Sequence, residues 1–286
     1  MALIEASFDG FFIKAAQALQ PYRDRVVFIG GCANALYRHH PVANHAAMRP
    51  LTTFDLDLAA PNRLPVVAST SLHAVLSSAG IRPIPANQRT NKFRTSPDAT
   101  ETLEFLCPLT GVAKKIRDQS PALVDIQPDC TAEALDYLDL LLLYPWTIDL
   151  KDVPPLAVAE SLPINIPNPV SYVMQKVLIR SRRGTAAKRA KDCYYIYETA
   201  VLFRNALPTV TDSARQVAGC MPAKWCKDFV RLADETFGHV NAVGIQESLS
   251  VAEENGIPVT AAMIHLAIAR LLVAIESGLP SPRGTP

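Results

Sequence analysis

The stretch from Val26 to Leu58 constrains the fold more than any other part of the chain. It opens with four apolar residues, and Gly30 and Gly31 follow directly. A short apolar run that ends in glycines predicts a buried strand that turns sharply into the next element. Because the residues after the glycines carry apolar side chains at helical spacing, we expect the glycines at a helix N-terminus. Backbone N–H groups at such an end favour anions, phosphate above all.

The same stretch ends in a strand pattern that carries two carboxylates. Residues 52–58 are Thr-Thr-Phe-Asp-Leu-Asp-Leu, so Asp55 and Asp57 alternate with apolar residues and share one face of the predicted strand. Two carboxylates about 7 Å apart along a strand repel each other unless a cation lies between them. Hard divalent ions such as Mg²⁺ take oxygen ligands, usually one or two carboxylates together with substrate phosphates.

A glycine pair at a strand–helix turn, followed by an Asp-x-Asp strand, resembles the nucleotidyltransferase superfamily of the polymerase-β type. Members of that superfamily carry a third acid on a neighbouring strand. Glu104, inside the apolar strand pattern of residues 101–108, stands in the matching place here. By itself, Glu104 would be interpreted as a charge on the solvated face of an edge strand. The presence of the Asp-x-Asp strand favours the interpretation of Glu104 as a metal ligand.

The resemblance implies an α+β fold and a site. A mixed β-sheet with flanking helices is expected over residues 1–168, and the proline-rich passage before 169 separates it from a helical domain over 169–286. The resemblance implies catalytic and metal-binding roles for Asp55, Asp57 and Glu104, with Mg²⁺ or Mn²⁺ as the ion and an NTP as substrate. Two ions about 4 Å apart stabilise the entering and the leaving oxygen in such enzymes.

A basic segment follows the proline-rich passage. Between Lys176 and Lys191 the chain has seven Lys or Arg and no acid, and Asp192 comes next. This segment resembles the C-terminal signature of bacterial abortive-infection and toxin-type nucleotidyltransferases and their uncharacterised relatives. The resemblance implies that Lys176 contacts phosphate and that Asp192 orients Lys176 or a basic neighbour. A solvated helix face is the usual alternative for such a run of charges.

Further phosphate or nucleotide contacts are assigned to residues near these motifs: Gly30, Gly31, Thr53, Arg94, Arg180 and Lys191. Two features depart from the smallest superfamily members. The spacer between Gly31 and Asp55 is long, so we expect residues 40–50 to form a loop over the site. Gly31 also stands where a serine hydroxyl would otherwise contact phosphate.

Periodicity predicts the remaining elements. Strands are expected at 81–84, 91–95 and 140–144, the last pairing with 146–150. Helices are expected at 5–20, 64–79, 134–138, 170–178, 186–205, 212–218, 223–237 and 260–277, with Asp212 and Thr260 as N-caps.

Composition narrows the class of protein without choosing a substrate. The net charge of +1 forces no nucleic-acid partner, and the six cysteines form no C-x-x-C pair, so we expect reduced thiols and a cytoplasmic location. No uninterrupted apolar run has the length of a membrane span, and we expect no membrane partner.

We therefore predict a metal-dependent nucleotidyltransferase that moves NMP from an NTP to a hydroxyl on RNA, a protein or a small molecule. A rival hypothesis keeps the fold as a catalytically silent nucleotide- or RNA-binding protein, for example in a toxin–antitoxin or defence system. A scaffold protein is the third. Phosphohydrolases and glycosyltransferases with Asp-x-Asp motifs fit less well, since residues 52–53 are threonines and the glycine turn has no role in a glycosyltransferase.

Overall fold

The computed structural model describes residues 3–44, 50–67, 69–84, 92–110 and 122–280. The chain divides into two units, one made of Met1–His39 and Pro50–Pro167, the other of His40–Arg49 and Asn168–Pro286. The division after Pro167 adjoins the expected boundary, but the segment 40–49 groups with the helical unit. The loop expected at 40–50 falls largely in this segment, and its residues 45–49 lie outside the described part of the chain.

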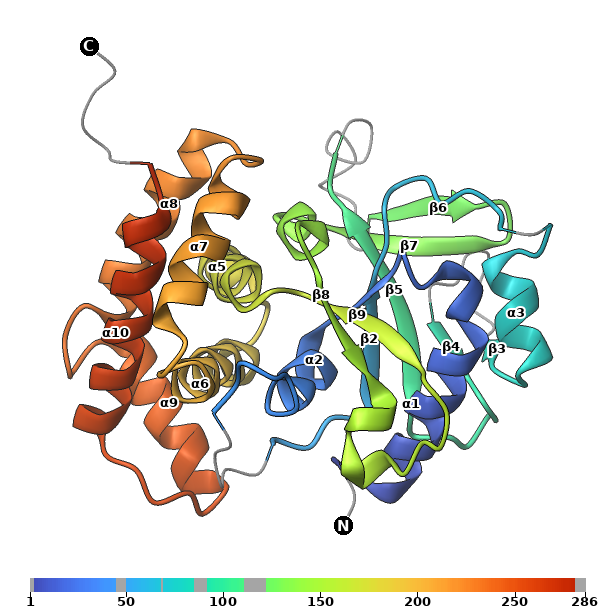
Figure 1. The fold of residues 1–286 in the computed structure, drawn as a ribbon, viewed down its shortest axis with the longest axis horizontal. Coiled ribbons are helices and arrows are strands. Elements are labelled where there is room, and N and C mark those ends of the chain that lie inside the picture. Colours follow the sequence, from blue (N-terminus) through green and yellow to red (C-terminus); the bar gives the residue numbers. More distant parts are fainter. Residues whose placement is uncertain (1–2, 45–49, 68, 85–91, 111–121, 281–286) are drawn as a thin grey trace. The chain divides into compact units, whose positions relative to one another are not determined.

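The first unit is built on a mixed β-sheet (Figure 1). Within the described residues its seven strands are β1 (Val27–Phe28), β2 (Asp55–Ala59), β3 (Arg82–Pro83), β4 (Lys92–Arg94), β5 (Thr102–Pro108), β6 (Leu123–Gln127) and β7 (Cys130–Leu135). The order is β1-β2-β5-β4-β3, and β7 joins the end of β5 with β6 beside it. The central strand β5 runs parallel to β2 and β7, and its pairing with β4 is antiparallel.

One face of this sheet forms the main core of the unit. Strand alternation places a set of fully buried side chains on it: Leu56, Leu58, Phe93, Leu103 and Phe105. Helix α1 (Ala6–Ala18) contributes Phe12, whose ring meets Phe28 of β1 edge-on with centroids 5.5 Å apart. Helix α3 (Leu72–Ser78) lies beside α1 (Figure 1). The apolar half of each strand pattern is thus what anchors the strands.

The opposite face is divided into an apolar end and a polar end. At the apolar end, Val27 and Ala59 pack with Leu138 and Leu141 of the 3-10 helix η2 (Leu138–Leu142). At the other end of β2 the same face carries Asp55 and Asp57. Helix α2 (Gly30–Tyr37) follows β1 and packs beside β2. The polar end is where the candidate site lies.

A small second sheet completes this unit. Strands β8 (Trp146–Asp149) and β9 (Pro163–Ile166) pair antiparallel, and the short 3-10 helices η3 (Leu150–Asp152) and η4 (Pro154–Leu156) connect them; a further 3-10 turn, η1 (Gln20–Tyr22), follows α1. The expected pairing of 146–150 with a strand at 140–144 is therefore wrong, as is the helix at 134–138. Tyr137 and Tyr144 adopt positive φ angles of 61° and 46°, and these turns bracket η2 and break both predicted elements.

The second unit is helical (Figure 1). Its elements are α5 (Pro169–Ile179), η5 (Arg180–Arg182), α6 (Ala186–Leu202), α7 (Leu207–Ala218), α8 (Ala223–Phe237), α9 (Val243–Glu254) and α10 (Ala261–Gly278). Side chains cap three of the helices, because Asn168, Thr185 and Thr260 each accept a hydrogen bond from the backbone N–H three residues on. At Gly278 an added Cβ would lie 2.4 Å from the carbonyl oxygen of Thr211, so α10 and α7 pack backbone to backbone there.

Three helix predictions need correction. The helix expected at 64–79 begins only at Leu72, because Ser71 caps it and accepts the N–H of Ala74 at 3.2 Å. Helix α7 begins at Leu207, with Pro208 in its first turn, so Asp212 is not its N-cap. Helix α9 was not expected at all, since small or polar residues occupy several of its buried positions, namely Gly244, Ser248 and Ala252. The expected helices 223–237 and 260–277 are confirmed within one residue.

Helix α10 has the length and hydropathy of a membrane span, the single such helix among the described residues. Its sequence contains polar residues, so an uninterrupted apolar run did not mark it. Its inner face buries Ile264, Ile268, Leu271 and Ile275 inside the helical unit. Met263, Leu266 and Val273 remain more than half exposed on its outer face.

Candidate functional site

Three acids lie side by side at the polar end of the sheet. Asp55 and Asp57 share one face of β2, and Leu56 and Leu58 fill the core on the other. In the parallel pairing of β2 with β5, Asp57 stands directly opposite Glu104. Neighbouring strands are about 4.8 Å apart, so these two carboxylates face the same space. The structure thus brings the three acids of the sequence prediction onto one surface.

The carboxylates differ in exposure and in their partners. Asp55 is exposed and accepts a hydrogen bond from the Thr102 hydroxyl at 2.8 Å, whereas Asp57 and Glu104 are half-buried. Thr53, expected to contact nucleotide, is buried, and its hydroxyl donates to the backbone oxygen of Asp55 at 3.3 Å. In this structure Thr53 therefore supports the strand that carries the acids.

The glycine turn packs directly against Asp57. Gly30 has a φ of +66°, and an added Cβ would lie 2.5 Å from Oδ2 of Asp57, so both the backbone angle and the space require glycine. The N–H of Ile29 donates to the backbone oxygen of Asp57 at 2.9 Å. Gly31, the second helical residue, is buried. The glycine turn and Asp57, far apart in the sequence, thus lie side by side.

The pKa of Cys32, in the first turn of α2, is affected by the same carboxylate. Burial raises the pKa of the Cys32 thiol well above its usual value, and the negative charges of Asp57 and Asp9 raise it further. The thiol therefore stays protonated and acts as a buried apolar contact rather than as a nucleophile.

A lysine not assigned to the site lies at its edge. Lys92 of β4 is paired in register with Glu104, and its Nζ is 3.3 Å from Oε2 of that residue. Partial burial alone would lower the pKa of Lys92, but attraction to Glu104, Asp55 and Glu133 raises it above its usual value. The sequence contains a pattern that could have found it. Lys92 and Arg94 flank the buried Phe93, so alternation in the strand places both cations on the same face.

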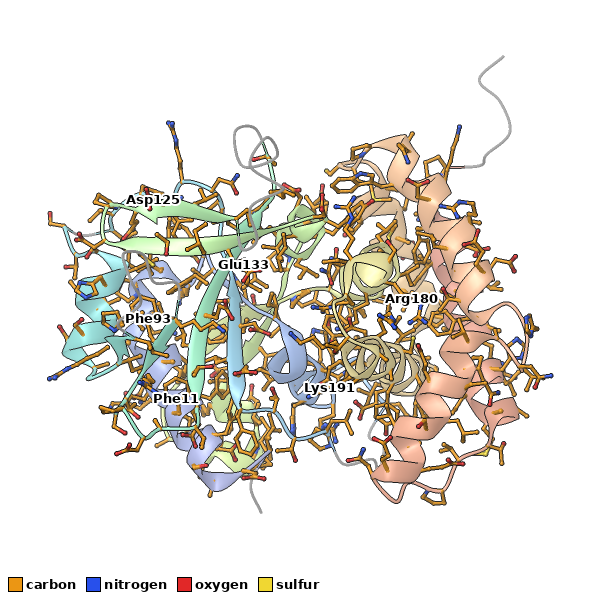
Figure 2. All side chains as sticks on the ribbon, turned by 180° about the vertical axis from the view of Figure 1, so that it is seen from behind. Phe11, Phe93, Asp125, Glu133, Arg180 and Lys191 are labelled. Atoms are coloured by element: carbon orange, nitrogen blue, oxygen red, sulfur yellow. The ribbon has the colours of Figure 1, made fainter. Side chains whose placement is uncertain are left out.

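Glu133 extends the acidic surface onto β7. It lies opposite Leu106 of β5, and Figure 2 shows it where β7 meets the central strands, with Asp125 on the neighbouring β6. It was missed because residues 134–138 were assigned to a helix. Arg94, an expected phosphate contact, is half-buried at the end of β4 and pairs through its backbone with Arg82.

The acids fit a divalent ion only in part. Mg²⁺ usually takes one or two protein carboxylates and completes its octahedron with water and substrate phosphates, which suits Asp55 and Asp57. No group of three His, Cys, Asp or Glu side chains in the described residues is arranged to hold a metal ion. Glu104 instead faces the ammonium group of Lys92.

A second, separate cluster of charges lies inside the helical unit. Lys176 on α5 is 4% exposed, and its Nζ donates to Oδ1 of Asp192 on α6 at 2.5 Å. Arg183 approaches the other oxygen of the same carboxylate at 2.6 Å. The rings of Tyr172 and Tyr195 lie 4.6 and 4.9 Å from the ammonium nitrogen, so the cation is also held by two aromatic faces.

The pKa of Asp192 reflects these partners. Burial alone would raise the pKa of its carboxyl, but the charges of Lys176 and Arg183 outweigh this and hold the pKa below its usual value. Asp192 is therefore ionised at neutral pH. It was expected to orient Lys176 or a basic neighbour, and in the structure it pairs with Lys176 and Arg183 together.

The rest of the basic segment divides between buried pairs and solvent. Arg180 donates to Glu247 of α9 at 2.7 Å and is mostly buried, whereas Arg182 and Lys188 are exposed. The Nζ of Lys191 lies 5.6 Å from the centre of the Tyr195 ring. Figure 2 shows Arg180 and Lys191 among the helices of this unit. The segment is thus neither a uniform solvated face nor a single open basic patch.

Comparison with known proteins adds a family assignment. A family described as Nucleotidyltransferase matches residues 9–218, well over half of the chain. The chain belongs to this nucleotidyltransferase family. No curated protein and no solved structure matches the chain significantly.

The family match covers both charge clusters. It includes the strand-borne acids, the glycine turn and the Lys176–Asp192 pair, and it ends at Ala218, the last residue of α7. The three helices that follow, α8, α9 and α10, lie outside it. Helix α9 nevertheless contacts the matched part, because its Glu247 forms an ion pair with Arg180.

Proposed function

We propose that this nucleotidyltransferase-family protein transfers NMP from an NTP to a hydroxyl acceptor with the help of Mg²⁺ or Mn²⁺. One observation carries the proposal. Asp57 lies between Gly30 of the helix-opening turn, which approaches its carboxylate, and Glu104, which faces it on the adjacent parallel strand. This arrangement places acids that can hold a cation next to a helix end that favours phosphate.

Each part of the site has a distinct task in this proposal. Asp55 and Asp57 hold the divalent ion, which supplies charge neutralisation on the triphosphate when bound. The backbone N–H groups of Gly30 and Gly31 hold phosphate oxygens, and Arg94 adds a positive charge on the same side of the sheet. Glu104 completes the acidic surface next to the acceptor hydroxyl.

The transfer itself exchanges one phosphorus–oxygen bond for another. The acceptor hydroxyl oxygen bonds to the α-phosphorus, and the bond from that phosphorus to the oxygen bridging to the β-phosphorus breaks. Pyrophosphate leaves with the electron pair, and the hydroxyl proton passes to solvent. The chain contributes position and charge, which are the main requirements of phosphoryl chemistry.

The helical unit supplies further cations. Lys176, Arg180 and Lys191 are proposed to contact nucleotide phosphates, with Asp192 orienting Lys176. What supports this is the run of seven Lys or Arg, without an acid, from Lys176 to Lys191. Lys176 and Arg180 are already paired with Asp192 and Glu247, so their interaction with phosphate would be shared with those acids.

Label transfer tests the reaction. The purified protein is incubated with each α-labelled NTP, Mg²⁺ or Mn²⁺, and a mixture of total RNA and cell lysate. We expect label on a macromolecule with the parent protein and none with Asp55→Ala/Asp57→Ala. A matched control, Asp129→Asn, changes an exposed aspartate in the β6–β7 turn and should transfer label like the parent. The labelled species identifies RNA or protein as the acceptor.

A silent nucleotide-binding protein is the second candidate, and one observation favours it. The third acid, Glu104, is paired with Lys92, and no three-ligand metal group forms among the described residues. This alternative predicts metal-dependent NTP binding by the parent protein with no label on RNA, protein or small molecules. Transfer by the parent, lost in the double aspartate variant, would exclude it.

A further inference from the structure

Lys92 belongs to a row of charged residues that crosses three strands. Asp57 of β2 is in register with Glu104 of β5, and Glu104 is in register with Lys92 of β4. Side chains in register on adjacent strands point to the same face of a sheet. The row therefore presents two carboxylates followed by an ammonium group, and the last two are in contact at 3.3 Å.

The surroundings of Lys92 are acidic on several sides. Besides Glu104, its ammonium group interacts with Asp55 and Glu133. The side chain of Glu104 is 14% exposed and that of Lys92 is 52% exposed, so the acid is mostly buried and its cationic partner is half in solvent. A positive group in this place occupies the region where a divalent ion bound through Glu104 would have to lie.

We propose that Lys92 is a built-in cation that takes the place of the second divalent ion, so that the site binds one ion, through Asp55 and Asp57. This inference rests on the proposed nucleotidyl transfer and concerns how its charges are balanced. Four negative charges lie on this face, carried by Asp55, Asp57, Glu104 and Glu133. Lys92 and Arg94 offset two of them, and a single divalent ion offsets the other two. A second ion next to Lys92 would meet a like charge at short range.

The inference assigns Lys92 a distinct chemical role. In a two-ion site, one ion assists the entering oxygen and the other the leaving oxygen. The aspartates hold the one ion. The ammonium group of Lys92 lies beside Glu104, which is the acid proposed to lie next to the acceptor hydroxyl. It would stabilise negative charge that develops on the entering oxygen, while Glu104 keeps the flexible lysine in place.

Counting bound Mn²⁺ tests the inference without relying on turnover. The protein is titrated with Mn²⁺ in the presence of an α,β-methylene NTP analogue, with protein in excess over the analogue, and followed by electron paramagnetic resonance. The parent should bind one magnetically isolated ion per analogue. Lys92→Met keeps the length of the side chain and removes its charge, so a second, spin-coupled ion should bind at least about tenfold more tightly than in the parent.

Two control variants sharpen the result. Lys92→Arg keeps the positive charge and should bind a single isolated ion, as the parent does. Lys151→Met removes an exposed charge from η3, away from the acidic row, and should also match the parent. Lys92 is half-exposed, so Lys92→Met should fold, and a thermal melt of each variant checks this.

Three outcomes would overturn the inference. A spin-coupled ion pair in the parent would show that Lys92 does not exclude a second ion. One isolated ion in both the parent and Lys92→Met would show that its charge does not control the count. No bound Mn²⁺ in the parent, with the analogue bound, would overturn this inference and the proposed metal-dependent function together. Label transfer by the same parent preparation separates the first two results from failure of the proposed function.

Discussion

The two charge clusters of this protein use the same residue types in opposite ways. In the sheet unit, Asp55, Asp57 and Glu104 share one face of the sheet; Asp55 is exposed, and Glu104 is paired with the half-exposed Lys92. In the helical unit, Asp192 is buried and is matched by two cations. The first arrangement leaves carboxylates that can bind a cation, whereas in the second the charges balance one another, so a phosphate would have to share Lys176 with Asp192. Their difference predicts that substitutions will separate activity from stability.

Asp57→Asn should have the largest effect of all, and on activity alone. It removes one charge from the ion-binding pair and should lower label transfer by at least about 100-fold. The free energy of unfolding should change by less than about 1 kcal/mol. Asp57 is half-buried opposite Glu104, and the substitution removes the repulsion between the two carboxylates. Label-transfer rates and urea denaturation on one preparation test both halves. Equal losses of stability and activity would contradict the comparison.

Asp192→Ala should lower stability most, with a smaller loss of label transfer because Lys176 is no longer oriented. It leaves the Lys176 ammonium buried without its carboxylate, which typically costs about 3–5 kcal/mol of stability. The double variant Lys176→Met/Asp192→Leu removes both charges and should regain most of this loss, since Arg183 is 28% exposed and can turn to solvent. Urea denaturation of the parent, Asp192→Ala and the double variant measures these differences in stability. A fully stable Asp192→Ala protein would mean that the cluster serves function and contributes nothing to folding.

Gly30→Ala tests the contact between the glycine turn and the acids. The left-handed backbone angle costs about 1–2 kcal/mol for a residue with a Cβ, and the added carbon must also displace the Asp57 carboxylate. We expect a modest fall in stability and a larger fall in label transfer. Gly256→Ala is a matched control, because this glycine has a similar φ of +64° but open space around it. It should lose stability without losing transfer.

The sequence predicted the arrangement of the two aspartates and the glycine turn better than that of the elements around them, for a physical reason. Alternation in a strand follows from backbone geometry, so the shared face of Asp55 and Asp57 could be read directly from residues 52–58. The glycine turn was placed correctly because few residues tolerate its backbone angle. The register that brings Glu104 opposite Asp57 could not be derived from residues alone, and the family resemblance indicated only a third acid on a neighbouring strand.

Errors arose where short elements depend on turns or on distant partners. Residues 134–144 contain leucines at spacings that suit a helix or a strand, and only the positive φ at Tyr137 and Tyr144 decides between them. Lys92 falls in the strand expected at 91–95 but was left out of the site, because its partner Glu104 is contributed by a different strand. The cation count of the basic segment did not reveal that Asp192 and Glu247 hold three of its members.

The smallest expected effect is a pH dependence that belongs to Asp192. Its folded-state pKa is depressed, so its carboxylate stabilises the folded state above the unfolded pKa of about 3.9, and this contribution is lost as the pH falls through the lower folded-state value. The difference in unfolding free energy between the parent and Asp192→Asn should therefore be constant from neutral pH down to about pH 5 and shrink below about pH 4. Urea denaturation across this range measures it. A difference that stays constant to the lowest pH would show that the buried cations do not act through the charge of Asp192, and that shape and hydrogen bonding hold the cluster instead.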